Sequence, residues 1–176
     1  MRWSLLIAVP VCLATVLWAE EDQFAFIPDG GRSLLAGLVA GLEPDARHSV
    51  LTRKAGSADW ADWARAQAPD MAETPVETLA GYAALNLPLA EVTDEDWAAQ
   101  LPPDGKDLAI AQCQFCHSLF TGYLMHDRDL TGWKGTFKAP FHTEIPMNEV
   151  ERDTFASYSA LNMPLSFEDV PPEWRF

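Results

Sequence analysis

The chain has 176 residues, 48% of them hydrophobic, and a formal net charge of −14 at pH 7. This length allows one domain of ordinary size or two small ones. The acidic balance argues against nucleic acid as a partner, because binding to phosphates requires basic patches. An acidic surface instead favours a basic protein partner that electrostatic attraction steers into contact. Solubility alone explains the charge equally well.

The first 19 residues have the pattern of a secretory signal. A basic start (Met1-Arg2) is followed by an apolar core at residues 5–11, and Ala19 precedes an acidic run. Signal peptides combine these features with a small residue at the cleavage site. We therefore predict that residues 1–19 are a signal peptide and that the mature protein is periplasmic.

An uncleaved signal is the alternative. Leu17, at the third position before the expected cut, is larger than the residue usually found there. Residues 3–18 would then anchor the protein to the inner membrane, although a span typically takes roughly 20 residues. Membrane association is expected only in that case. Cleavage also removes Cys12, which leaves Cys113 and Cys116 as the cysteines of the mature chain.

Two helices are predicted in the first half of the mature chain. The first covers the apolar residues 33–42. The second runs from Pro75 to Asn86, because Thr74 is a good cap residue and proline is favoured at the first helical position. Between them, the polar residues 44–47 predict a loop.

The chain then repeats itself. Residues 79–89 (LAGYAALNLPL) match residues 155–165 (FASYSALNMPL), 76 positions later. A shorter match pairs His48 with His117, 69 positions later. Because the separation rises along the chain, we interpret the pattern as an internal duplication with small insertions in the second copy.

A boundary separates the two copies. Proline and glycine are concentrated at residues 102–105, and such residues punctuate structure. We therefore divide the mature chain into a first unit, residues 20–100, and a second unit, residues 101–176.

The second unit contains Cys113-Gln114-Phe115-Cys116-His117, directly after a helix predicted at residues 106–112. C-x-x-C-H is the attachment sequence of a c-type haem. The two thiols add to the vinyl groups of one porphyrin as thioethers, and the histidine becomes the proximal iron ligand. A redox C-x-x-C pair needs no histidine, and a structural zinc site would require two further ligands. We therefore predict one covalent haem c.

The second unit resembles the class I cytochromes c over roughly residues 105–165. The resemblance rests on the motif, a loop at residues 122–135, and a helix after Asn148. Asn148 and Glu151 form a typical helix-start pattern. In that family, a helix like this one packs across the helix that carries the haem motif. Together with the duplication, the resemblance implies an all-α fold of two tandem cytochrome c-like helical units, the first haem-free and the second carrying the haem.

The first unit lacks the haem chemistry. In the sequence pairing, Pro44 and Arg47 stand opposite the two cysteines, so that thioethers cannot form there. His48 is retained opposite the motif histidine. A histidine that follows a polar loop is expected to be solvated rather than bound to a loose haem.

The sixth iron ligand has candidates among the methionines and histidines that follow the motif: Met125, His126, His142, Met147 and Met163. We expect Met147 to be the distal ligand, because the class I family places its ligand methionine in the loop before this helix. The alternatives are His142 and Met163. Met163 precedes a proline, as the family ligand often does, but pairs with Leu87 in the first unit. Met147 pairs with Val76.

A more distant similarity is to the monohaem subunits of periplasmic sulfite and related dehydrogenases. It rests on His117-Ser118, Trp133, Pro146-Met147 and Glu151-Arg152. It implies a partner enzyme that passes electrons to this chain.

The sequence therefore predicts an exported monohaem c-type cytochrome that transfers single electrons. It would act as a free carrier or as the electron-accepting subunit of a periplasmic dehydrogenase, with a redox protein that has a basic docking face as its partner. The protein supplies ligation, burial and electrostatics, so no catalytic residues are expected. The alternative is a haem enzyme, or a gas or redox sensor, with an open sixth coordination site.

Overall fold

The computed structural model describes residues 22–93 and 95–176, and the regular secondary structure of these residues is helical. The predicted all-α class is confirmed. The expected signal segment, residues 1–19, lies outside the described residues. The helices are α1 (Gly31–Ala40), α2 (Pro44–Leu51), α3 (Ser57–Gln67), α4 (Glu73–Asn86), α5 (Trp97–Gln100), α6 (Gly105–Gln112), α7 (Leu130–Thr136) and α8 (Glu149–Asn162), with short helical turns η1 (Cys113–Phe115), η2 (Phe120–Leu124), η3 (His142–Glu144), η4 (Phe167–Asp169) and η5 (Pro172–Trp174).

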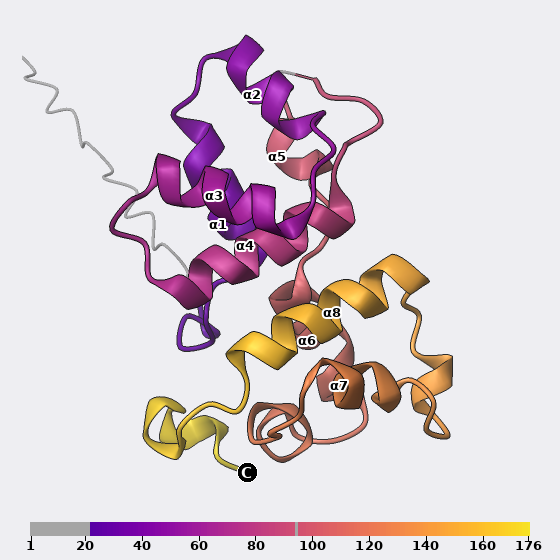
Figure 1. The fold of residues 1–176 in the computed structure, drawn as a ribbon. Coiled ribbons are helices and arrows are strands. Elements are labelled where there is room, and N and C mark those ends of the chain that lie inside the picture. Colours follow the sequence, from indigo (N-terminus) through magenta and orange to yellow (C-terminus); the bar gives the residue numbers. More distant parts are fainter. Residues whose placement is uncertain (1–21, 94) are drawn as a thin grey trace, which may run out of the picture.

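The helices form two groups, α1–α5 and α6–α8, which lie one above the other in Figure 1. Each group has its own core of buried apolar side chains. The N-terminal core consists of Leu35, Val39, Leu51, Trp60, Ala61, Ala64, Val76, Leu79, Ala80, Tyr82, Ala83, Leu87 and Leu101. The C-terminal core consists of Phe24, Ile27, Leu108, Ala109, Leu119, Tyr123, Leu124, Trp133, Phe137, Met147, Phe155, Ala156, Tyr158, Met163, Leu165 and Val170.

The segments that precede α1 and α6 each pack against the other group of helices. Phe24 and Ile27 precede α1 but belong to the C-terminal core, where Phe24 packs on Trp174 with ring centroids 5.0 Å apart. Leu101 precedes α6 but belongs to the N-terminal core. The two groups therefore hold each other through exchanged segments as well as through helix packing.

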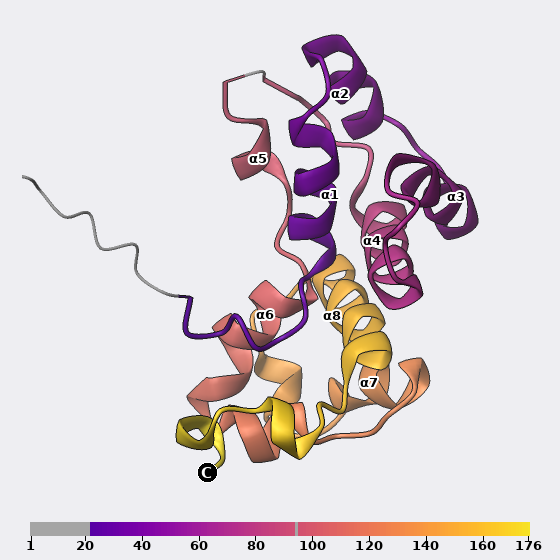
Figure 2. The same ribbon diagram turned by 90° about the vertical axis from the view of Figure 1, so that its left-hand side faces the viewer.

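Helices α4 and α8 lie side by side at the junction of the two groups (Figures 1 and 2). Their polar contacts are reciprocal. Asn86 Nδ2 donates to Thr154 Oγ1 and Asn162 Nδ2 donates to Thr78 Oγ1, both at 3.0 Å. Both threonines are buried. These bonds satisfy polar groups that would otherwise be buried without partners.

Each of these helices also crosses the first helix of its own group at a glycine. A Cβ at Gly31 of α1 would overlap Tyr82 of α4, and a Cβ at Gly105 of α6 would overlap Tyr158 of α8. The two hydroxyls donate across the junction, Tyr82 Oη to the carbonyl of Pro102 at 2.7 Å and Tyr158 Oη to that of Pro28 at 2.6 Å. Glycine is required at both crossings because the backbones approach so closely.

The start of α8 is as predicted. Asn148 Oδ1 accepts from the backbone N–H of Glu151 at 3.0 Å, and the Glu151 carboxylate accepts from the N–H of Asn148 at 2.7 Å. This is a complete capping box. Helix α4 begins at Glu73, two residues before the predicted start at Pro75.

Two segments expected to be loops are helical. Residues 44–47 open α2, because Pro44 occupies the first helical position and Asp45 lies in the first turn. Residues 122–135 contain the end of η2 and most of α7. Asp129 caps α7 by accepting from the N–H of Gly132 at 2.7 Å. The two glycines of α7 lower its helix propensity, so the sequence pattern predicts a loop there.

A single buried carboxylate caps α1 and α6 together. Asp104 is 1% exposed and accepts from the backbone N–H of Asp107 in α6 and from that of Arg32 in α1, both at 3.0 Å. Burial raises the pKa of Asp104, although the N–H donors oppose this shift. The corresponding cap residue of α1 is Gly30, which has no side chain, and a Cβ there would overlap the Asp104 carboxyl. Only one carboxylate fits between the two helix ends.

This shared cap predicts strong coupling between Gly30 and Asp104. We expect Asp104→Gly to lower the free energy of unfolding by about 1–3 kcal/mol, because two helix ends lose an acceptor. Gly30→Ala should also destabilise the protein, by steric overlap. In the double variant the loss of unfolding free energy should be smaller than the sum of the two single losses, since the Asp104 carboxyl that the new Cβ would overlap is absent. Urea denaturation measures all three.

Gly56→Ala is the matched control. Gly56 is also a cap glycine with extended backbone, but the nearest atom to its added Cβ would be Asp59 Oδ2 at 3.9 Å. It should change stability little. Additive losses for Gly30→Ala and Asp104→Gly would contradict the shared cap.

Candidate functional site

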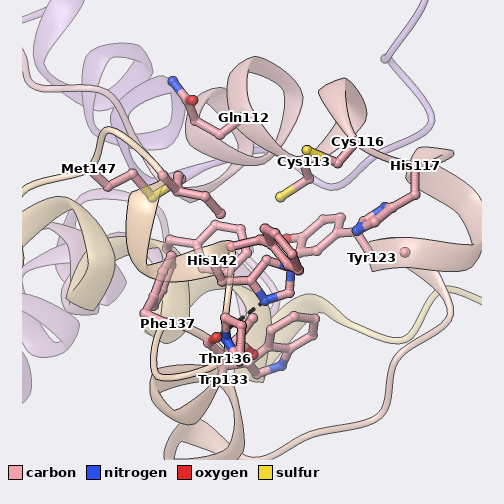
Figure 3. Close-up of a pocket in the computed structure, with 15 residues that line it drawn as sticks. Gln112, Cys113, Cys116, His117, Tyr123, Trp133, Thr136, Phe137, His142 and Met147 are labelled. Carbon is pink, nitrogen blue, oxygen red and sulfur yellow. Dashed lines mark hydrogen bonds between the residues drawn. The ribbon is translucent and has the colours of Figure 1, made fainter.

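A cavity of about 550 Å³ lies in the C-terminal group of helices, within the usual size range of cofactor pockets. Figure 3 shows the side chains that converge on it from α6, η2, α7, η3 and α8. Most are aromatic or aliphatic. The lining residues are Gln112, Cys113, Cys116, His117, Gly122, Tyr123, Trp133, Thr136, Phe137, Pro140, Phe141, His142, Ile145, Met147 and Phe155.

Helix α6 delivers the two cysteines to this cavity. It is capped by Asp104 and ends at Gln112, and the chain continues as the tight turn η1 through Phe115. Cys113 and Cys116 are three residues apart and both line the cavity, where Figure 3 shows their sulfur atoms. Cys113 is the more enclosed thiol, and burial raises its pKa to about 12. Cys116 is exposed, so this end of the cavity opens at the surface.

In Figure 3 His117 lies beside Cys116, and its ring points toward the cavity. Its Nδ1 lies 3.4 Å from the carbonyl oxygen of Ser118. A Cβ at Gly122 would overlap Nδ1 and Cε1 of the ring. Gly122 thus forms a cradle in which the imidazole rests against the backbone of η2.

Two of the five candidate distal residues line the cavity, His142 and Met147. Met163 is buried in the C-terminal core, outside the lining. Met125 and His126 also lie outside it, and the His126 ring packs on Trp133 with centroids 6.4 Å apart. Cys113, Cys116 and His117 are therefore brought together with His142 and Met147.

Sequence reasoning did not identify Gly122 or Tyr123 as parts of the site. Tyr123 is 1% exposed and its hydroxyl lies 3.0 Å from Ser159 Oγ, which ties η2 to α8. Trp133, named from sequence, is buried, and its Nε1 has no hydrogen-bond partner among the described residues. The only sequence signal for the cradle is the five-residue spacing between His117 and Gly122. This spacing does not correspond to an established motif.

These residues fit a c-type haem. Two thiols and one imidazole on a single apolar cavity are the donor set that this group needs. The Gly122 cradle holds the imidazole, and the free N–H of Trp133 could be satisfied by a polar acceptor on a bound group. The described residues hold no group of three or more His, Cys, Asp or Glu side chains placed to bind a metal ion. A haem requires none, because the porphyrin nitrogens supply the other ligands.

No protein-family model, curated protein or solved structure matches this chain. Within the part of the chain that the structure describes, no helix has the length and apolar character needed to cross a membrane.

The cradle predicts that Gly122→Ala displaces the His117 ring, because the added methyl group would overlap it. In an exporting host that attaches c-type haem, we expect a severalfold lower yield of chains with low-spin haem, measured by the visible spectrum per chain. Gly135→Ala is the matched control, since a Cβ there would meet no atom within 4 Å. Equal yields for both variants would show that the cradle is unimportant.

Proposed function

We propose that the protein is an exported monohaem c-type cytochrome that transfers single electrons. It would serve as a free carrier or as the electron-accepting subunit of a periplasmic dehydrogenase. The observation that carries the proposal is the convergence of Cys113, Cys116 and His117 on one apolar cavity. A spacing motif that arises by chance would have no reason to face a pocket of cofactor size.

The residues of the site have distinct parts in this function. Bound haem would supply reversible one-electron cycling between Fe(III) and Fe(II). The two thiols would hold it covalently, and His117 would ligate the iron. Tyr123, Trp133 and Phe155 form an aromatic wall, with neighbouring ring centroids 5.4–5.8 Å apart, that excludes water from one side of the cavity. Water exclusion and ligation together set the potential.

Electron exchange would take place at the open end of the cavity, where Cys116 and the neighbouring Phe115 are exposed. The formal charge of −14 supports a redox partner with a basic docking face, because opposite net charges accelerate encounter. No nucleic acid is expected among the partners.

We also propose that the chain consists of two tandem cytochrome c-like units, of which the first is haem-free. Support comes from contacts of one half that recur in the other. Thr78, Tyr82 and Asn86 make the same bonds as residues 76 positions later. The carbonyl of Leu51 accepts from the N–H of Leu89 at 2.9 Å, and residues 124 and 165 repeat this bond.

These contacts give a different pairing from the sequence comparison near the haem motif. The Leu51–Leu124 equivalence places His48 opposite Thr121, not His117. His48 is exposed, as expected of a solvated histidine. The α4–α8 equivalence places Met71, not Val76, opposite Met147.

The first unit would have no space for a haem. The Gly31–Gly105 equivalence puts Val39 and Leu42 in place of the two cysteines. The Leu51–Leu124 equivalence gives Trp63 the position of the cavity residue Thr136, and the Trp63 ring packs edge-on against Trp60 with centroids 5.6 Å apart. Bulky apolar side chains at these positions support the proposal that the first unit holds no haem.

The proposal predicts a reversible one-electron couple with a low-spin haem in both oxidation states. Spectroelectrochemistry of the purified mature protein should show isosbestic conversion, and the reduced protein should not bind CO readily, because both axial positions are filled. A high-spin spectrum with rapid CO binding would instead indicate a haem enzyme or gas sensor, and a protein without haem would refute the proposal.

A further inference from the structure

We propose that His142, rather than Met147, is the distal iron ligand, opposite His117. This inference rests on the proposed function. It differs from the methionine that the resemblance to class I cytochromes c implies. It is carried by the relation between two imidazole rings, by the hydrogen bonds that orient them, and by the packing of Met147.

The rings of His117 and His142 are separated by the distance expected of two imidazoles that share one metal ion. Their centroids lie 6.5 Å apart. A metal–imidazole nitrogen bond is about 2.0–2.1 Å, and the centroid of a ring with bonds of about 1.33 Å lies about 1.1 Å from each atom. Two such spans in line give roughly 6.3 Å. The two rings are nearly perpendicular, at 81°.

Hydrogen bonding leaves the same nitrogen of both rings free. Nδ1 of His142 lies 3.2 Å from the carbonyl oxygen of Thr136, and Nδ1 of His117 lies 3.4 Å from that of Ser118. A carbonyl only accepts, so the proton resides on Nδ1 and the lone pair on Nε2. Metal-binding histidines are commonly oriented by this kind of bond to the backbone. Figure 3 shows the His142 ring in the cavity with its bond to Thr136.

The backbone before His142 is strained in a way that packing does not explain. Phe141 has φ of 69°, the left-handed region that bulky residues avoid. Its side chain is 82% exposed, so burial of the ring does not offset this conformation. Such strain concentrates where a side chain must be held in a functional position. Here the turn places His142 over the cavity.

Met147 lines the cavity as well, but core packing accounts for its position. It is 6% exposed and belongs to the C-terminal core. Figure 3 draws it at the far end of the cavity from His117, with His142 between the two in that view. Arg152 Nε donates to the Met147 carbonyl at 3.0 Å, which fixes this end of the loop. The position equivalent to Met147 in the haem-free half is Met71, so a methionine persists there without an iron to bind.

The decisive experiment is the spectrum of ferric protein, for the wild type and two variants. Wild type should be low-spin and lack the far-red sulfur–iron charge-transfer band. His142→Ala should convert it to high-spin and allow CO to bind the reduced form. Met147→Leu should keep the low-spin spectrum. His126→Ala is the matched control, a histidine outside the cavity, and should resemble wild type.

A further variant, His142→Met, keeps the test valid if His142→Ala does not fold or does not acquire haem. His142→Met should retain a low-spin haem but gain the sulfur–iron band and a higher reduction potential, because methionine raises the potential relative to a second histidine. A sulfur–iron band in wild type that Met147→Leu abolishes would overturn the assignment and leave the cytochrome proposal standing. A mature chain without covalent haem would overturn both.

Discussion

The close crossing of α6 and α8 at Gly105 and Tyr158 is the constraint on which the site depends. Any side chain at residue 105 would overlap the tyrosine, so glycine is required where the two helices cross. This crossing orients helix α6 so that its last residue, Gln112, and the following Cys113 line the cavity. Asp104, one residue before the crossing, fixes the start of the same helix. The five-residue motif reaches the cavity because this crossing holds the helix that precedes it.

The half without the motif contributes to the same arrangement. Helix α4 covers one face of α8, and the buried hydroxyl of Thr78 accepts a hydrogen bond from the side-chain amide of Asn162. The Asp104 carboxylate accepts from the backbone of Arg32 in α1, so the start of α6 is completed by the other half. Removal of that half would expose polar and apolar surface that are both buried here, and buried polar groups without partners are costly. Under the proposed function, this half would serve as a structural support for the half that carries the motif.

Local chemistry decided what could be predicted from sequence. The capping box at Asn148 and Glu151 involves residues only three positions apart, so the sequence pattern predicts it and the structure contains it. Helix α7 was missed because Gly132 and Gly135 lower its propensity, while its stability comes from the Asp129 cap and from the burial of Trp133. The proposed distal ligand, His142, lies in a loop that Arg152 of α8 holds through the carbonyls of Thr143 and Ile145, and no spacing rule predicts such contacts.

The most direct test of the central claim is the number and place of covalent haems on the mature chain. Protein exported by a host that attaches c-type haem should gain the mass of one haem, and peptide mapping should locate it on the peptide that contains Cys113 and Cys116. An intact mass without haem would contradict the assignment of the cavity. Two haems per chain would contradict the account of the first half as a haem-free support.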